Sequence, residues 1–195
     1  MANDFALKKR SARDRILDAA TELFDPNGYG AVGIDTIIAE AGVAKRTLYR
    51  HFASKDELIA AYLERTNAEY LGWIDEEIAK VDAPVEKLRT YLALVQQRTT
   101  NPATVGCTFQ VAAAEFPNLE HLGHKEAAAH KDEVRGRLRK LACEAGLLEP
   151  DLLADELLLL IDGAWAAARM FGAQPETPAN VLTKAADVLI ESHTS

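Results

Sequence analysis

Between residues 45 and 55 the chain gathers side chains that can bind phosphate and the edges of nucleic-acid bases. They are Lys45, Arg46, Thr47, Tyr49, Arg50, His51 and Lys55. Ammonium and guanidinium groups neutralise phosphate, and both can also pair with the O6 and N7 atoms of guanine. Hydroxyl groups add hydrogen bonds to phosphate oxygens. No acid interrupts the run before Asp56. These residue types therefore indicate contacts with double-stranded DNA.

Two short helices joined by a glycine must position these side chains. The apolar spacing predicts one helix over 33–41 and another over 45–51, and Gly42 suits the left-handed residue of a tight turn. Ile37 and Leu48 fall where the two helices must pack on each other, so the polar side chains of the second face outward. A helix-turn-helix has this organisation, and its second helix enters the major groove. The hairpin alone is also a common packing unit, so the cationic face is the more specific signal.

Charge is distributed unevenly along the 195 residues, whose net charge is -8. Residues 1–58 contain nine Lys or Arg and nine Asp or Glu, so this part is neutral. The remaining 13 Lys or Arg and 21 Asp or Glu, all in 59–195, supply the whole acidic excess. Because an acidic surface repels DNA, we expect any DNA contact to be confined to the N-terminal part.

The rest of the chain also follows a helical pattern. Strand-like alternation of β-branched residues is almost absent, which predicts an all-α fold of about nine helices. Ser11 and Ser54 begin two of these helices, each followed three residues later by an acid that can complete a capping box. Further helices are predicted over 11–25, 54–81, 84–98, 108–115, 117–146, 151–172 and 178–192.

From Arg13 to Leu58 the sequence resembles the N-terminal domain of the TetR/AcrR family of repressors. The likeness is carried by the segments 16–20, 23–24, 28–30, 41–43, 47–52 and 54–58. It implies an N-terminal three-helix helix-turn-helix DNA-binding domain over 1–53 and a helical effector-binding and dimerisation domain over 54–195. By this resemblance the phosphate contacts are Thr36, Thr47, Tyr49, His51 and Lys55, and the residues nearest the bases are Lys45, Arg46 and Arg50.

Four positions depart from the usual family pattern. Val32 stands where a threonine commonly caps the second helix, and Ile38 stands where alanine is usual. Ala44 and Arg46 replace a usual serine and a small residue, which removes a cap or phosphate contact and adds a side chain that can read bases. The cations of segment 8–10 are compatible with a flexible minor-groove arm and equally with a solubilising tail.

One helix-turn-helix reads few base pairs, so a homodimer with two recognition helices is expected. Apolar stripes on the last two predicted helices are candidates for its interface, as the resemblance implies. They comprise Leu153, Leu157, Leu160, Ile161, Ala164, Leu182, Ala185, Ala186 and Leu189. The same stripes are also compatible with the core of a single chain.

The resemblance further implies a small-molecule effector, held in a pocket between the central helices. The segment Gly106–Phe116 resembles a stretch found in one subset of the family. Candidate lining residues are Tyr70, Trp73, Tyr91, Val95, Cys107, Phe109, Gln110, Trp165 and Met170. Because aromatic side chains dominate this set, an apolar or aromatic small molecule is the expected effector.

No metal or other cofactor is expected. His121, His124 and His130 lack a cysteine or carboxylate at ligand spacing and are predicted to be solvated surface residues. Cys107 and Cys143 are predicted to be packed, reduced thiols, with a disulfide or redox switch as the alternative. The longest aliphatic run, 157–161, is far shorter than the roughly 20 residues of a membrane span, so we expect a cytoplasmic protein with no membrane partner.

Enzyme motifs are absent from the sequence. It contains no phosphate-binding loop of the form GxxxxGK[ST], no HExxH and no GxSxG, and no histidine follows a glutamate by three residues as in a di-iron bundle. We therefore expect no enzyme but a dimeric DNA-binding transcriptional regulator, a repressor that a small molecule releases from its operator. The alternatives are a constitutive DNA-binding or nucleoid-associated dimer without an effector and, more remotely, a helical-bundle enzyme.

Overall fold

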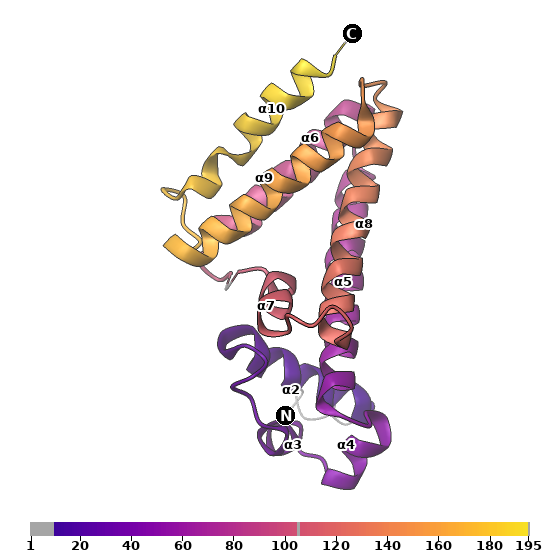
Figure 1. Ribbon diagram of the computed structural model, residues 1–195, viewed down its shortest axis with the longest axis vertical. Helices are drawn as coiled ribbons and strands as arrows, with labels where there is room; N and C mark the ends of the chain where they lie inside the picture. The colour runs from indigo at the N-terminus through magenta and orange to yellow at the C-terminus, as the bar shows by residue number, and fades with distance from the viewer. Residues whose placement is uncertain (1–9, 105, 195) are drawn as a thin grey trace, which may run out of the picture. The chain divides into compact units, whose positions relative to one another are not determined.

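The structure is a computed structural model that describes residues 10–104 and 106–194. Within these ranges it contains nine α-helices, one 3-10 helix and no strand, which confirms the predicted all-α class (Figure 1). The helices are α2 (Ala12–Asn27), α3 (Ile34–Ala41), α4 (Lys45–His51), α5 (Lys55–Ile78), α6 (Pro84–Thr99), α7 (Thr108–Glu115), α8 (Leu122–Glu144), α9 (Pro150–Phe171), η1 (Pro178–Val181) and α10 (Leu182–Ser192).

The helix boundaries follow the predicted ones closely, and the local signals explain why. The Ser11 side chain accepts from the backbone of Asp14, whose carboxylate in turn accepts from the Ser11 backbone, so the capping box of α2 is confirmed. Gly42 lies in the left-handed region with φ 59°, as predicted. One prediction was wrong: α8 begins at Leu122, because the Asn118 side chain accepts from the Glu120 backbone and forms a local turn instead.

The chain divides into two compact units. Unit 1 comprises residues 1–66 and 108–127, and unit 2 comprises residues 67–107 and 128–195. Helices α5 and α8 therefore each supply residues to both units. Helix α7 belongs to unit 1, although it lies more than forty residues beyond the last of the N-terminal residues in that unit. The predicted division at residue 53 stays a prediction.

Unit 1 is built around an apolar core beneath α3 and α4. Helix α2 packs on both of these helices, and α3 contacts α4. Its fully buried side chains include Ile16, Leu17, Ala20, Ile37, Leu48 and Leu58. Three aromatic rings extend this core, with the Phe24 ring centroid 5.2 Å from that of Tyr29 and 5.5 Å from that of Tyr62.

Helix α7 is bound to the N-terminal part of unit 1 at both of its ends. At its C-terminus the Glu115 carboxylate accepts from the backbone N–H groups of Tyr29 and Gly30, at 3.1 and 2.6 Å. At its N-terminus the Thr108 hydroxyl lies 2.6 Å from the Tyr29 hydroxyl and 2.8 Å from that of Tyr62. Gly28 adopts φ 77°, and a Cβ atom there would lie 2.4 Å from the Glu115 carboxylate. Only glycine fits both constraints.

Unit 2 is a bundle in which α6, α9 and α10 contact one another. The acidic excess of the sequence is used here in ion pairs. Between α8 and α9 these pairs are Lys131–Asp162, Arg135–Asp155 and Arg139–Asp151. Their order along the two helices runs in opposite directions, so the pairs fix an antiparallel alignment. Since they are at least partly exposed, each contributes at most about 1 kcal/mol to stability.

The described residues also correct four predictions about single side chains. His124 is half-buried and not solvated, because its Nδ1 atom lies 2.8 Å from the Phe116 carbonyl oxygen. His130 is only 4% exposed and not solvated, and Cys143 is exposed and not packed. His121 is half-buried because its ring stacks on Phe116 at a centroid distance of 4.0 Å. In residues 10–104 and 106–194 no helix is long and apolar enough to cross a membrane, and no three potential metal ligands lie together.

The bond between Glu115 and the 29–30 backbone predicts a specific loss of stability. In Glu115→Gln one carboxylate oxygen becomes an NH₂ group that faces a backbone donor. We expect the free energy of unfolding to fall by about 1 to 3 kcal/mol, measured by urea denaturation. Glu22→Gln is the matched control, because Glu22 is exposed and should change stability by less than about 0.5 kcal/mol. Equal stability of the two variants would contradict a structural role for Glu115.

Candidate nucleic-acid interface

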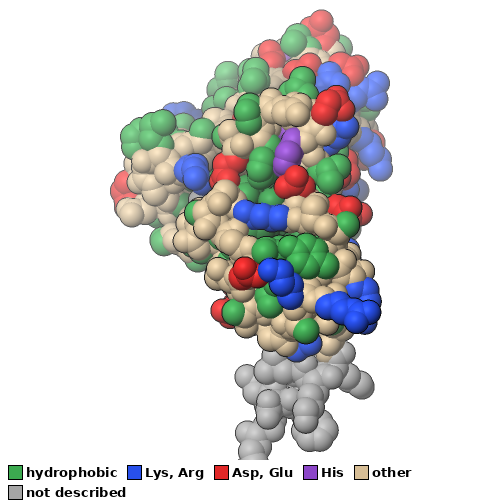
Figure 2. All heavy atoms as spheres, turned by 60° about the horizontal axis from the view of Figure 1, so that its bottom comes forward, with side chains coloured by type: hydrophobic (Ala, Val, Ile, Leu, Met, Phe, Trp, Pro, Cys, Tyr) green, Lys and Arg blue, Asp and Glu red, His purple; other side chains and the backbone are tan. Residues whose placement is uncertain are grey.

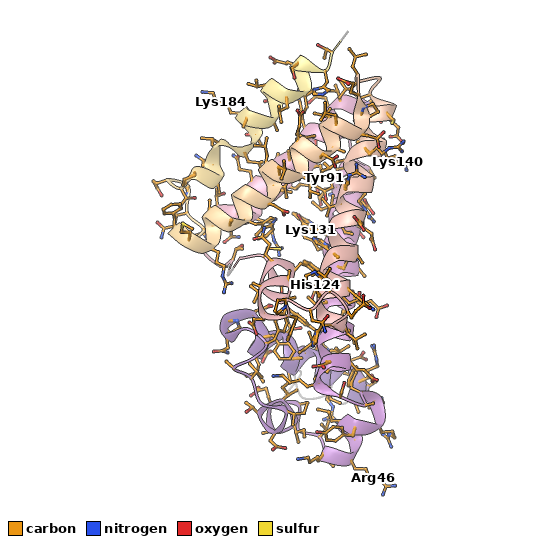
Figure 3. All side chains as sticks on the ribbon, in the orientation of Figure 1. Arg46, Tyr91, His124, Lys131, Lys140 and Lys184 are labelled. Atoms are coloured by element: carbon orange, nitrogen blue, oxygen red, sulfur yellow. The ribbon has the colours of Figure 1, made fainter. Side chains whose placement is uncertain are left out.

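Helix α4 presents the cationic residues of the sequence pattern on its outer side. Its one buried residue is Leu48, which is 0% exposed and anchors the helix. Lys45, Arg46, Tyr49, Arg50 and His51 are exposed, and Thr47 is half-buried. Figure 3 shows Arg46 extending away from the protein at the end of unit 1. In Figure 2, Lys and Arg side chains gather over the lower part of the surface, with hydrophobic side chains between them.

The beginnings of α3 and α4 lack side-chain caps. The N-cap of α3 is Gly33 and not Val32, whose side chain is buried, so the prediction that Val32 stands at this cap was wrong. Gly33 and Ala44 occupy the two N-cap positions, and neither makes a side-chain hydrogen bond that caps its helix. This confirms the predicted loss of a cap at Ala44. The uncapped backbone N–H groups at the start of α4 are therefore available to an acceptor, and a DNA phosphate is one that helix N-termini commonly bind.

An acid that the sequence pattern did not reveal lies beside the cationic helix. The Asp35 carboxylate on α3 accepts a hydrogen bond from the Lys45 ammonium at 3.0 Å. This bond is the first cause of a raised Lys45 pKa, and the Coulomb attraction of Asp35 adds to it. Both side chains are well exposed. The positive charge of Lys45 is therefore partly neutralised by an acid of its own chain.

Lys55 has a structural partner as well. Its ammonium donates to the backbone carbonyl of Tyr29 at 2.6 Å, and the residue is half-buried. Ser54 caps α5 by accepting from the Glu57 backbone at 3.1 Å, while the Glu57 carboxylate accepts from the backbone of Ala53. Lys55 thus ties the start of α5 to the loop that Glu115 also holds. Its predicted phosphate contact stays a prediction.

The remaining predicted DNA contacts are the cations of segment 8–10 and Thr36. Lys8 and Lys9 of the possible minor-groove arm lie outside the described residues. Arg10 forms an ion pair with Asp18 at 2.5 Å, which ties it to α2. Thr36, the additional predicted phosphate contact, is exposed in the first turn of α3.

The residues predicted to line the effector pocket are divided between the two units. Tyr70, Trp73, Tyr91, Val95, Cys107, Trp165 and Met170 belong to unit 2, whereas Phe109 and Gln110 belong to α7 in unit 1. Tyr91 and Val95 are fully buried, and the Tyr70 ring lies 6.2 Å from that of Trp73. Met170 is 75% exposed, so its side chain does not line an enclosed pocket.

Most residues predicted for the dimer interface lie inside unit 2. Those buried in the single chain are Leu153, Leu157, Ile161, Ala164, Leu182 and Ala186. Leu160, Ala185 and Leu189 are half-buried. A side chain that its own chain covers has little surface left for a partner. The apolar spacing that singled out these residues therefore marks the side of each helix that packs into the core of unit 2.

Comparison with known proteins finds similarity along nearly the whole chain. The family model described as "Bacterial regulatory proteins, tetR family" matches residues 16–62. An uncharacterized HTH-type transcriptional regulator of Mycobacterium tuberculosis is 30% identical over 189 residues, which cover 86% of this chain and 94% of that protein. The HTH-type transcriptional repressor KstR2 of Rhodococcus jostii is 27% identical over 175 residues, covering 84% of this chain and 81% of that protein.

A solved structure extends the likeness to three dimensions. The crystal structure of SCO4454, a TetR-family transcriptional regulator from Streptomyces coelicolor, matches with a TM-score of 0.84 at 29% sequence identity. The match covers 94% of this chain and 96% of that one. It thus includes the helices of both units.

The Asp35–Lys45 pair predicts how charge at this interface controls DNA affinity. In Asp35→Asn, Lys45 loses its competing carboxylate, so affinity for DNA of any sequence should rise. The slope of log K against log salt should steepen by up to about 0.9, the value for one additional phosphate contact. Fluorescence anisotropy over a salt series measures both quantities.

Glu40→Gln is the matched control for this prediction, because it removes an exposed acid from the same helix away from Lys45. It should change the salt slope much less than Asp35→Asn. An unchanged slope in Asp35→Asn, or an equal change in both variants, would contradict competition between Asp35 and phosphate.

Proposed function

The chain belongs to the TetR family of bacterial regulatory proteins and is a DNA-binding transcriptional regulator, and from this premise we propose that it is a homodimeric repressor. Its partners are operator DNA, a second copy of the chain and a small-molecule effector that releases the operator. The similarity to KstR2, which is named a transcriptional repressor, supports repression over activation. Because the DNA it would regulate is chromosomal, we place its action in the cytoplasm.

The observation that carries the proposal is the outward face of α4. Arg46 and Arg50 are exposed on a helix whose inner side is fixed by buried Leu48. In the major groove, Arg46 would pair with guanine, while the hydroxyls of Thr47 and Tyr49 would bind phosphate. Thr36, His51, Lys45, Arg50 and Lys55 complete the proposed interface.

A single unit of this kind contacts too few base pairs for specific binding, so we propose a dimer through the outer faces of α9 and α10. Large apolar side chains are exposed there in an otherwise charged unit: Leu152, Leu159, Met170, Val181 and Val188. Leu152 and Leu159 are seven residues apart on α9, so they share one side of that helix. Val188 lies on α10, and Val181 ends the 3-10 helix η1 directly before it. Exposed apolar patches of this kind are typical of protein interfaces.

We propose that the effector binds in unit 2 and acts through the helices that both units share. Helices α5 and α8 run from one unit into the other without a break. A ligand that prefers one arrangement of these helices in unit 2 would favour the matching arrangement of their other ends. It can lower operator affinity by no more than the ratio of its own affinities for the two arrangements.

The DNA-binding proposal is tested by a gel-shift titration against the DNA upstream of the gene. The wild-type protein should prefer this DNA over a random duplex of equal length. Arg46→Ala should weaken binding to the preferred sequence by about 1 to 3 kcal/mol of binding free energy and should reduce discrimination between bases at the contacted position. Arg139→Ala, which removes an exposed arginine from α8, is the control and should bind as the wild type does. The absence of any sequence-preferring complex at moderate salt would reject the proposal.

The dimer proposal is tested by sedimentation equilibrium. Leu159→Glu and Val188→Glu each place a charge in the proposed apolar interface, where an unpaired carboxylate is costly. At micromolar protein concentration, each variant should sediment as a monomer where the wild type sediments as a dimer, and each should lose operator binding. Leu119→Glu is the control, since Leu119 is 67% exposed outside this face. A wild-type monomer would reject the proposed dimer, and dimers in both variants would place its interface elsewhere.

A further inference from the structure

Unit 2 contains a cluster in which one arginine lies over two aromatic rings. The Arg98 guanidinium, at the end of α6, lies 5.6 Å from the centroid of Trp73 and 6.0 Å from that of Tyr70. The Tyr70 ring also lies 6.0 Å from the ring of His130 on α8. Three helices therefore meet around Tyr70, since Tyr70 and Trp73 belong to α5.

Arg98 and Arg169 differ from the other arginines of this unit in having no ion pair with an acid of the described residues, and of these two Arg98 is the one that lies over aromatic rings. Arg89, Arg135, Arg137 and Arg139 each form an ion pair with an aspartate. Within the described residues Arg98 has no acidic partner, and its contacts are those with the two rings. Arg98 is exposed, so the cation–π contacts orient its guanidinium while its N–H donors stay open to solvent. Such a group is suited to receive a carboxylate from outside the chain.

A second polar group in the cluster is buried without a partner. Tyr91 is 0% exposed, and its hydroxyl forms no hydrogen bond with the described residues. Burial, with the neighbouring Tyr70 as a further cause, raises the Tyr91 pKa well above its ordinary value. The hydroxyl is therefore protonated and can donate a hydrogen bond. Leaving a buried donor unused costs about 1 to 3 kcal/mol, which makes this hydroxyl unusual.

Tyr91 and Arg98 lie on the same side of one helix. They are seven residues apart on α6, a spacing of two turns and about 10 Å along the axis. Figure 3 shows Tyr91 among the helices of unit 2. The chain thus offers a cation and a hydrogen-bond donor at two ends of an aromatic surface.

Beside Tyr70 the cluster also contains two neutral polar groups, the Asn67 amide and the His130 imidazole. The Asn67 amide donates to Glu133 at 3.3 Å, which turns its oxygen toward His130 Nδ1 at 2.6 Å. The Nδ1 atom of His130 therefore carries its proton. Burial first, and then the charges of Lys131 and Arg137, lower the His130 pKa to about 3, so the imidazole is neutral at physiological pH. Since Arg137 is paired with Asp75, the available positive charge is that of Arg98.

We propose that unit 2 binds a planar aromatic carboxylate with a second oxygen at its far end. The carboxylate pairs with Arg98, the rings lie against Tyr70 and Trp73, and the Tyr91 hydroxyl donates to the second oxygen. Offset stacking on aromatic side chains favours a planar body over an aliphatic one. The inference rests on the proposed function in that this ligand is the effector that releases operator DNA.

Isothermal titration calorimetry on the full chain without DNA tests the site through three matched probes. They are 6-hydroxy-2-naphthoate, 2-naphthoate and 2-naphthamide, which share one ring system. The hydroxynaphthoate should bind most tightly and the amide at least 10-fold more weakly than either carboxylate. Arg98→Gln should weaken both carboxylates about 10- to 100-fold, the usual effect of losing a charge-assisted hydrogen bond, and leave the amide unchanged.

Variants at two further positions separate ligand binding from folding. Tyr91→Phe should weaken 6-hydroxy-2-naphthoate about 5- to 20-fold and leave 2-naphthoate unaffected, because only the first offers an oxygen to the hydroxyl. Without ligand, its melting temperature should equal or exceed that of the wild type, because an unsatisfied buried group is removed. Lys140→Gln, on the exposed side of α8, is the control and should bind all three probes as the wild type does.

Three results would overturn the proposal. These are no binding of either carboxylate to the wild type, equal binding of the amide, and unchanged carboxylate affinity in Arg98→Gln. Failure of the proposed repressor function would be seen in a gel shift and not in the calorimetry. If 6-hydroxy-2-naphthoate binds but the operator complex persists in a gel shift, the site stands and its role as the effector site is rejected. If no operator complex forms at all, the repressor proposal fails whatever calorimetry shows.

Discussion

The recognition surface depends on the burial of one leucine. Helix α4 has seven residues, no side-chain cap and a single buried side chain, Leu48. A helix so short is unstable in water, so its conformation comes from packing and not from propensity. Packing of Leu48 into the core of unit 1, together with the left-handed turn at Gly42, sets which side of α4 faces outward. Every exposed cation of α4 takes its direction from this constraint.

Local chemistry explains why the helices were predictable while several partners were not. Periodic apolar residues, serine caps and Gly42 act over a few residues, so the sequence alone predicted nearly all helix boundaries. The bonds of Glu115 to the 29–30 backbone join residues at least 85 apart. Lys45 and Asp35 are ten apart and meet only because the turn folds α3 back on α4. Such contacts depend on tertiary geometry, which also buries His130 and places α7 in unit 1.

Apolar periodicity has a further limit in unit 2. It marks the face of α9 that includes Leu157, and the structure uses that face for the core. Leu159, only two residues on, is 74% exposed. Many acids of this unit are paired with its cations across α6, α8, α9 and α10, whereas Arg98 lies over two aromatic rings instead. The net charge of the sequence could not reveal which cations pair with acids and which lie against aromatic rings.

The pair of Asp35 and Lys45 has a consequence for the time that the regulator spends on DNA while it searches. Asp35 acts as an internal anion that a phosphate must displace, and the exchange of one anion for another brings little gain at an exposed site. Random DNA offers α4 mainly phosphates, whereas an operator also offers base edges to Arg46. In the interface proposed above, the pair therefore shortens each stay on non-operator DNA more than it shortens the stay on the operator.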